Sequence, residues 1–267
     1  MIQGKRIACV IPARLRSTRF PQKMLTSLAG KPLLQRVWEQ ALSVPVFDEV
    51  CIAVDAKETQ QLIEGFGGRC IMTSDRCPSG TDRLAEVLER HLIEADIWVN
   101  WQGDEPFICA EMIADLLQGC EVKKTDVWTL KKRIRSESEY LNPHIAKVVC
   151  DYAGYALYFS RNAIPFYRDG ASFEQKEVYK HVGLYAYTTE ALQRIQMLPV
   201  CPLENAEQLE QLRFLFHHLR FRKRDRLQGP LQASISRSIR AHNRMHLPLA
   251  HREVKSLQND FALDGDF

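Results

Sequence analysis

The sequence lacks the features of a membrane-spanning or secreted chain. It has no stretch of 18 consecutive apolar residues, and its N-terminus has no apolar segment of the signal-peptide kind. The closest two of its eight cysteines are seven positions apart, so there is no CxxC pair of the kind found in zinc knuckles and thioredoxin-like proteins. GxGxxG and Walker A sequences are also absent. Several cysteines lie inside apolar runs, as buried reduced thiols do, and we therefore expect a cytoplasmic protein without membrane contact.

What the sequence does contain is ordinary for a folded chain. Its 267 residues are 45% hydrophobic and 26% charged, which suffices for a core without disulfides or structural metal. The net charge of +3 is unevenly spread: residues 217–267 carry 10 Lys and Arg against 5 Asp and Glu, whereas the others carry 26 against 28. A basic end can bind nucleic acid, but this one lacks interleaved aromatic residues and any known motif. We expect no nucleic-acid partner.

Short apolar runs alternate with helical patterns in the first part of the chain. The patterns predict strands at 5–12, 50–54, 69–73 and 96–101, and helices at 33–42, 57–65 and 81–91. This alternation predicts an α/β fold with a mostly parallel, doubly wound sheet. Ligands of such sheets bind beyond the carboxyl ends of the strands.

The pattern changes after residue 145. Two apolar runs flank Tyr152-Ala153-Gly154, which predicts an antiparallel hairpin. A further strand is predicted at 182–187. Residues 204–219 predict a helix, with Glu and Gln near its start and basic residues near its end.

A basic loop follows the first predicted strand. Eight cations precede Glu39, the first acidic residue of the chain, and four of them lie in this loop: Arg14, Arg16, Arg19 and Lys23. Arginine offers phosphate oxygens a planar fork and lysine a point charge. The charges alone would also suit a solvated surface loop, but the position after a strand favours a polyphosphate site.

Two further polar segments begin where strands or loops end. Residues 100–106 (NWQGDEP) follow an apolar strand, and a carboxylate such as Asp104 at that position can hold Mg²⁺ through its oxygens. The bland alternative is a plain polar turn. Residues 79–83 (SGTDR) open a helix, and ordinary helix capping explains Ser79 and Asp82 equally well.

Taken together, seven segments resemble the bacterial 3-deoxy-manno-octulosonate cytidylyltransferases, the CMP-Kdo synthetases of lipopolysaccharide synthesis. The resemblance keeps the family's order and covers about residues 5–222. Its segments are PARLRSTRFPQK (12–23), SGTDRLAEV (79–87), NWQGDEP (100–106), NPHIAKVV (142–149), GYALYFSRNAIP (154–165), KHVGLYAY (180–187) and LEQLR (209–213).

The resemblance implies Mg²⁺-dependent transfer of CMP from CTP to the anomeric hydroxyl of Kdo by a homodimer. It implies that the triphosphate is held by Arg14 and Lys23, and that the metal is held by Asp104. The nucleotide would also be contacted by Ser79, Gly80, Arg83 and Gln102. The acidic sugar would be contacted by Arg161, His181, Tyr185, Glu210 and Gln211.

Each sugar-site residue also has a structural explanation. His181 lies beside an apolar strand, where a histidine is commonly a hydrogen-bonded core residue. Tyr185 alternates with Tyr187, so one of them could belong to the core. Glu210 and Gln211 are adjacent on a predicted helix and would point about 100° apart, which could leave one in solvent.

The sequence departs from the family at two places. The phosphate loop reads Pro21-Gln22-Lys23-Met24 where the family has Pro-Gly-Lys-Pro, so a flexible glycine is missing. After Phe221 the family's Gly-Val-Asp-Thr-Pro-Glu-Asp-Leu segment is absent, and with it the second metal ligand that the resemblance implies. The change to Arg, His, Ser and Gln is typical of a shifted reading frame or a replaced terminus.

We therefore predict a cytidylyltransferase domain at 1–222 and an atypical basic tail at 223–267. A hairpin extension at about 145–187 is expected to make dimer contacts. Two alternatives remain open: a cytidylyltransferase for another acidic or amino sugar, and a CTP-binding dimer whose turnover is impaired because the second metal ligand is missing.

Overall fold

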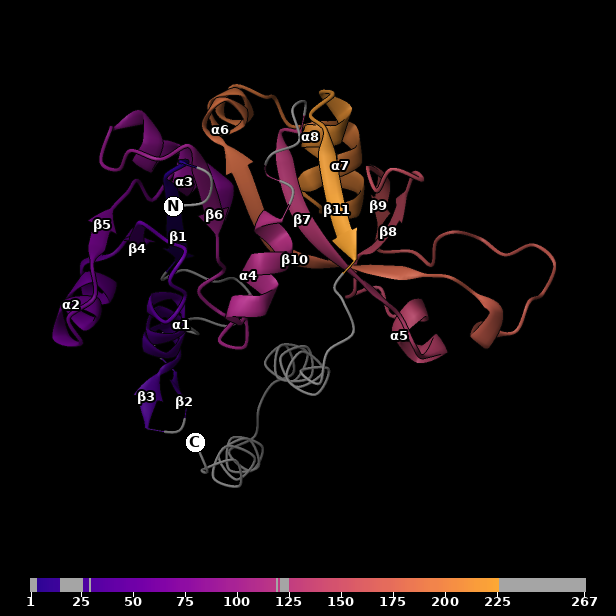
Figure 1. The fold of residues 1–267 in the computed structure, drawn as a ribbon, viewed down its shortest axis with the longest axis horizontal. Helices are drawn as coiled ribbons and strands as arrows, with labels where there is room; N and C mark the ends of the chain where they lie inside the picture. Colours follow the sequence, from indigo (N-terminus) through magenta and orange to yellow (C-terminus); the bar gives the residue numbers. More distant parts are fainter. Residues whose placement is uncertain (1–3, 15–25, 29, 119, 121–124, 226–267) are drawn as a thin grey trace. The chain divides into compact units, whose positions relative to one another are not determined.

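The computed structural model describes residues 4–14, 26–28, 30–118, 120 and 125–225 (Figure 1). Contacts divide these residues into two compact units. Unit 1 contains the described residues of 1–93 and 100–110, and unit 2 contains those of 94–99 and 111–227. Each unit is described by itself.

Unit 1 is built on three parallel strands. β1 pairs with β4 and β4 pairs with β5, and every residue of β1 is buried, as its unbroken apolar run predicts. A two-stranded antiparallel ribbon, β2–β3, precedes the first helix. The elements are β1 (Ile7–Ala13), β2 (Ser27–Leu28), β3 (Lys31–Pro32), α1 (Leu33–Leu42), β4 (Glu49–Val54), α2 (Lys57–Gly65), β5 (Cys70–Met72) and α3 (Gly80–Glu89).

Unit 2 is a mixed sheet with short helices. β10 runs antiparallel to β7 and β8, β8 runs antiparallel to β9, and β11 runs parallel to β7. Its first elements are β6 (Ile97–Asn100), α4 (Ala110–Leu117), β7 (Val127–Arg133), α5 (Glu137–Leu141), β8 (Lys147–Cys150) and β9 (Ala156–Ser160). They are followed by η2 (Phe173–Gln175), β10 (Tyr179–Thr188), α6 (Thr189–Gln196), α7 (Pro202–Glu207), α8 (Gln211–Phe216) and β11 (Phe221–Asp225). By their contacts Asn100 and Ala110 belong to unit 1.

The expected α/β class is confirmed, with parallel pairing in unit 1 and an antiparallel hairpin, β8–β9, in unit 2. The strand expected at 182–187 is longer, because β10 begins at Tyr179. No helix among the described residues is long and apolar enough to cross a membrane. The expected boundary between a domain at 1–222 and a tail at 223–267 stays a prediction.

The single helix expected over 204–219 is wrong. Two short helices, α7 and α8, occupy this region. Gln208 between them has a φ of 52°, in the left-handed region, so α7 ends there and the chain turns before α8 begins. The periodicity of apolar residues continues across the break, which is why the sequence pattern does not reveal it.

Candidate functional site

Arg14 is the first charged residue after the buried strand β1. Its Nη2 atom is buried and has no hydrogen-bond partner in the described part of the chain. Burial, reinforced by the nearby positive charge of Arg83, lowers the pKa of Arg14. An arginine in this state favours the approach of an anion that would pair with it. Lys23, with Arg16 and Arg19, lies outside the described residues.

The start of α3 lies against the end of β1. The Ser79 side chain caps the helix by accepting a hydrogen bond from the Asp82 backbone N–H (3.1 Å). A Cβ atom on Gly80 would lie 3.0 Å from Pro12 Cγ and 3.5 Å from Gln102 Nε2. A side chain at residue 80 would push against Pro12, so glycine favours this close approach, which brings Gly80 and Gln102 together.

Arg83 is fully buried and lies within the protein framework. It forms an ion pair with Asp55 (Nη2 to Oδ2, 2.9 Å) and donates to the Thr73 hydroxyl and the Ser74 carbonyl (3.3 Å). These contacts join α3 to the segments that follow β4 and β5. The resemblance predicts that Arg83 contacts the nucleotide. Its described partners are Asp55, Thr73 and Ser74, so Arg83 holds α3 in place.

The segment after β6 is held in a defined turn. The Glu105 backbone N–H donates to the Gln102 carbonyl (3.0 Å), and Trp101 Nε1 donates to the Glu105 carbonyl (3.0 Å). Gln102 Nε2 donates to Asn100 Oδ1 (3.0 Å). Asp104 lies in this turn and is partly exposed. The turn therefore presents a carboxylate and a carboxamide at the carboxyl end of β6.

Asp104 has the donor chemistry of a magnesium ligand. The described residues contain no group of three or more His, Cys, Asp or Glu side chains that could hold a metal ion. Magnesium does not require such a cage, because it commonly takes one or two carboxylates together with water and substrate phosphates. The chemistry of Asp104 fits a Mg²⁺ ion that takes its other ligands from water and from phosphate oxygens.

In unit 2 the structure brings His181 and Tyr185 together. The Cα atoms of residues four apart on a regular strand are about 13 Å apart. The side chains of His181 and Tyr185 nevertheless meet, because His181 Nε2 lies 2.7 Å from the Tyr185 hydroxyl. The register of β10 against β7 shifts between Val182 and Tyr185, and this bulge shortens the distance. The Thr129 hydroxyl lies 3.4 Å from His181 Nδ1, so the ring has a hydroxyl at each nitrogen.

Two more of the predicted sugar-site residues, Glu210 and Gln211, lie at the start of α8. Glu210 is the N-cap residue of this helix and is partly exposed, whereas Gln211 is buried. Burial, with a further contribution from the negative charge of Glu210, raises the pKa of Tyr185. The structure thus brings Glu210 near the pair formed by Tyr185 and His181.

Arg161 binds backbone carbonyls around this region. Its Nε donates to the Glu207 carbonyl (2.7 Å), its Nη2 to the Gln208 carbonyl (3.1 Å) and its Nη1 to the Pro143 carbonyl (3.3 Å). The Glu207 carboxylate in turn accepts from the Arg161 backbone N–H (2.8 Å). Arg161 therefore fixes the turn between α7 and α8, which carries Glu210.

Sequence reasoning missed Lys147, whose side chain is buried. Its ammonium donates to the carbonyls of Asn142 (2.8 Å), Ile145 (2.6 Å) and Arg161. Burial lowers the pKa of Lys147 to about 8, as does the charge of Arg161, while Glu207 acts in the opposite direction. A lone lysine inside the apolar run at 145–149 was the available signal, because a buried lysine is normally tied to acceptors.

Comparisons with known proteins show which family the chain resembles along most of its length. A family model described as "Cytidylyltransferase" matches residues 8–221. The 3-deoxy-manno-octulosonate cytidylyltransferase of Thermodesulfovibrio yellowstonii is 46% identical over 216 residues, covering 78% of this chain and 85% of that protein. The protein of the same name from Geobacter sulfurreducens is 46% identical over 225 residues, covering 81% and 89%. A solved structure of CMP:2-keto-3-deoxy-manno-octonic acid synthetase complexed with CTP is 39% identical, with a TM-score of 0.77, and covers 89% of this chain and 99% of that one.

Proposed function

The chain belongs to the 3-deoxy-manno-octulosonate cytidylyltransferases, a family of nucleotidyltransferases, and on this basis we propose that it transfers CMP from CTP to the anomeric hydroxyl of Kdo. The products are CMP-Kdo and pyrophosphate. The sugar hydroxyl oxygen attacks the α-phosphorus, its proton leaves, and the bond from the α-phosphorus to the bridging oxygen of the pyrophosphate breaks. Such a transfer depends on alignment and charge neutralisation more than on covalent help from the protein.

The observation that carries this proposal is the state of Arg14. A buried guanidinium nitrogen that has no hydrogen-bond partner among the described residues, close to a second buried arginine, is unfavourable until an anion arrives. The triphosphate of CTP supplies that anion, and Arg14 then stabilises the charge that develops on the leaving pyrophosphate. Lys23 is proposed to act beside it, as the family resemblance implies.

The rest of the proposed nucleotide site lies in unit 1. Gly80 lets Pro12 and Gln102 lie close to the start of α3, where Ser79 is already fixed by its capping bond. Gln102 presents its carboxamide from the turn after β6. When Mg²⁺ is bound, it would be held by Asp104 and would neutralise phosphate charge.

Unit 2 is proposed to bind the acidic sugar. His181 and Tyr185 supply hydrogen-bonding groups for the hydroxyls and the carboxylate, and Glu210 and Gln211 lie at the adjoining helix start. Arg161 positions this start through its bonds to the preceding turn. The chain is proposed to act as a cytoplasmic homodimer in lipopolysaccharide synthesis, an assignment that rests on the family resemblance.

Substitution of Asp104 tests the proposal. Asp104→Ala should lower CTP- and Kdo-dependent pyrophosphate release by about two to three orders of magnitude, because the ligand of the phosphate-bound metal is lost. Glu58→Gln, which changes an exposed carboxylate on α2, is the matched control and should leave the rate unchanged. An unchanged rate in Asp104→Ala would remove this residue from the mechanism.

One observation favours a second candidate, a chain that binds CTP without turnover. Residues 226–252 contain no acidic residue, whereas the family resemblance implies a second metal ligand after β11. Calorimetry with CTP and Mg²⁺ beside a turnover assay separates the two: binding without pyrophosphate release supports this candidate.

A further inference from the structure

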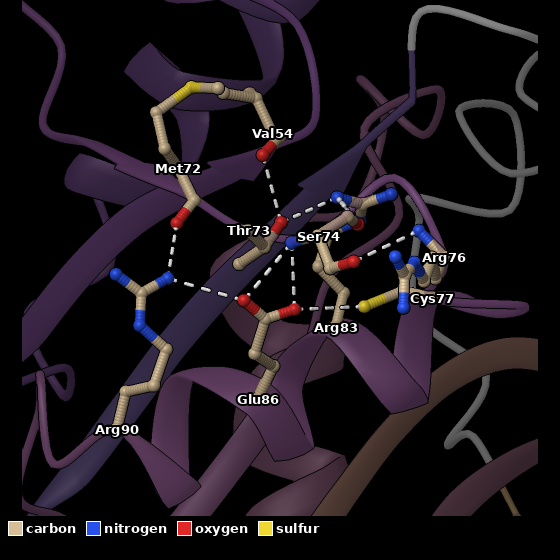
Figure 2. A network of polar contacts seen from close by, with 9 residues as sticks. All are labelled: Val54, Met72, Thr73, Ser74, Arg76, Cys77, Arg83, Glu86 and Arg90. Atoms are coloured by element: carbon tan, nitrogen blue, oxygen red, sulfur yellow. Dashed lines mark hydrogen bonds and ion pairs between the residues drawn. The ribbon is translucent and has the colours of Figure 1, made fainter.

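Glu86, on the second turn of α3, binds the loop that precedes its own helix (Figure 2). Its two carboxylate oxygens accept hydrogen bonds from the Ser74 backbone N–H, at 3.0 Å and 2.8 Å. Oε2 also accepts from the Cys77 thiol (3.1 Å), and Oε1 accepts from Arg90 Nη1 (3.2 Å). The Glu86 side chain is only 18% exposed, so these bonds are largely shielded from water.

The same helix holds the beginning of this loop at two more points. Arg90 Nη1 also donates to the Met72 carbonyl (2.6 Å), at the end of β5. Arg83 donates to the Thr73 hydroxyl and to the Ser74 carbonyl. The N–H and C=O groups of Ser74 are therefore both bound by side chains of α3, and the loop cannot shift along the helix without breaking these bonds.

The loop leads directly into Ser79 and Gly80. Four residues separate Ser74 from the capping serine, so the position of residues 74–77 sets how the chain enters the helix. We infer that Glu86 is a positioning residue for the nucleotide: by binding Ser74 and Cys77 it fixes the segment that carries Ser79 and Gly80. This inference rests on the proposed function, because that function places CTP at this segment.

The chemistry of the contacts requires a carboxylate at residue 86. Burial acts to raise the pKa of Glu86, but the hydrogen bonds from Ser74, Cys77 and Arg90 outweigh it and the pKa is lowered. Burial, followed by the bond to Glu86, raises the pKa of Cys77 to about 12, so the thiol keeps its proton and donates. Three groups thus donate to one acceptor-only side chain. A glutamine here would lose one acceptor oxygen and place its own N–H₂ against a donor.

Glu86→Gln tests the inference, with Glu89→Gln as the matched control. Glu89 is exposed at the end of the same helix, so its substitution removes the same charge at a position open to solvent. We expect Glu86→Gln to raise KM for CTP about tenfold or more, because a small displacement of a substrate-holding segment is costly. In Glu86→Gln, KM for Kdo should change by less than about twofold. Glu89→Gln should have the KM values of the wild-type chain. Cys77→Ala removes one of the donors and should raise KM for CTP by a smaller factor, about two- to fivefold.

Measuring KM and kcat separately distinguishes a loss of positioning from a loss of folded protein. A variant that folds poorly contains less active enzyme, so its apparent kcat falls while KM stays constant. A rise in KM for CTP, matched by a weaker Kd for CTP with Mg²⁺ in calorimetry, supports the inference. A Glu86→Gln chain whose KM and Kd for CTP equal the wild-type values overturns it.

The same experiment distinguishes failure of the inference from failure of the proposed function. A wild-type chain that binds CTP but releases no pyrophosphate contradicts the proposed function, and the calorimetric comparison of the two variants then decides the inference. A wild-type chain that does not bind CTP contradicts both.

Discussion

Replacing the buried Arg83 by methionine should lower the free energy of unfolding strongly, because the substitution breaks an ion pair that is shielded from water. Arg83 is 0% exposed and its partner Asp55 is 11% exposed, so their ion pair at 2.9 Å is almost entirely shielded from water. Methionine keeps most of the aliphatic stem and removes the guanidinium, which leaves the Asp55 carboxylate without this cation. Breaking a buried pair in this way typically costs about 3–5 kcal/mol. The Thr73 hydroxyl and the Ser74 carbonyl also lose a donor.

An exposed ion pair of the same unit provides the control. Arg69 on the approach to β5 pairs with Glu49 on β4, and the two side chains are 46% and 30% exposed. Such a pair contributes about 0–1 kcal/mol, so Arg69→Met should be nearly neutral. Both variants are compared with the wild-type chain by equilibrium unfolding in urea. The unfolding is monitored by tryptophan fluorescence and by circular dichroism, because coincident transitions show that it is two-state.

The double variant Arg83→Met/Asp55→Asn identifies the cause of the loss. If the loss of the ion pair with Asp55 is responsible, removing the charge of Asp55 should restore part of the stability, and the double variant should lose less than the two single variants together. An Arg83→Met chain that loses less than about 1 kcal/mol, as the exposed control does, would refute the reasoning.

Three further outcomes follow from the described contacts. Burial lowers the pKa of Lys147 from 10.5 to about 8, so between these pH values the unfolded chain holds a proton on Lys147 that the folded chain has released, and the contribution of Lys147 to the free energy of unfolding should rise with pH over this interval. Urea titrations of the wild-type and Lys147→Met chains at several pH values isolate this contribution as the difference between the two, and a difference that does not change with pH would contradict it. Gly80→Val should weaken CTP binding in calorimetry about tenfold or more by crowding the residues around it. Gly65→Ala, with open space around its Cβ, should leave CTP affinity unchanged and keep or raise the free energy of unfolding. Equal CTP affinities in the two variants would argue against the close approach. Tyr185→Phe removes the hydroxyl bonded to His181 and should lower the free energy of unfolding by about 1–2 kcal/mol and raise KM for Kdo, which urea unfolding and initial rates would measure.

Local patterns predicted the elements of unit 1 well because each has its own signal. β1 is an unbroken apolar run that the fold buries completely, and α1 and α2 begin and end as their periodicity predicts. The helix pair α7–α8 was not predicted, because its boundary depends on the left-handed backbone of Gln208 and on the bonds that Arg161 makes to the same turn. A tertiary contact of this kind leaves no periodic trace in the sequence.

The candidate site also combines features that the local sequence reveals with features that depend on tertiary contacts. Arg14 and Asp104 could be proposed as site residues from their places after strands, whereas Ser79 could be proposed only through the family resemblance. The pairing of His181 with Tyr185 could not, because it depends on a bulge that shortens a four-residue separation. Glu86 escaped notice for a similar reason: a glutamate in the middle of a helix is usually a solvent-facing residue, and only the fold brings the Ser74 N–H to it.

The central claim, that this chain makes CMP-Kdo, is tested most directly by product analysis. The wild-type chain is incubated with CTP, Mg²⁺ and Kdo, and pyrophosphate release is followed while the nucleotide products are identified by mass spectrometry. We predict Kdo-dependent release of pyrophosphate with the formation of an equal amount of CMP-Kdo. Release that does not depend on Kdo, or the absence of CMP-Kdo from a chain that binds CTP, would contradict the claim.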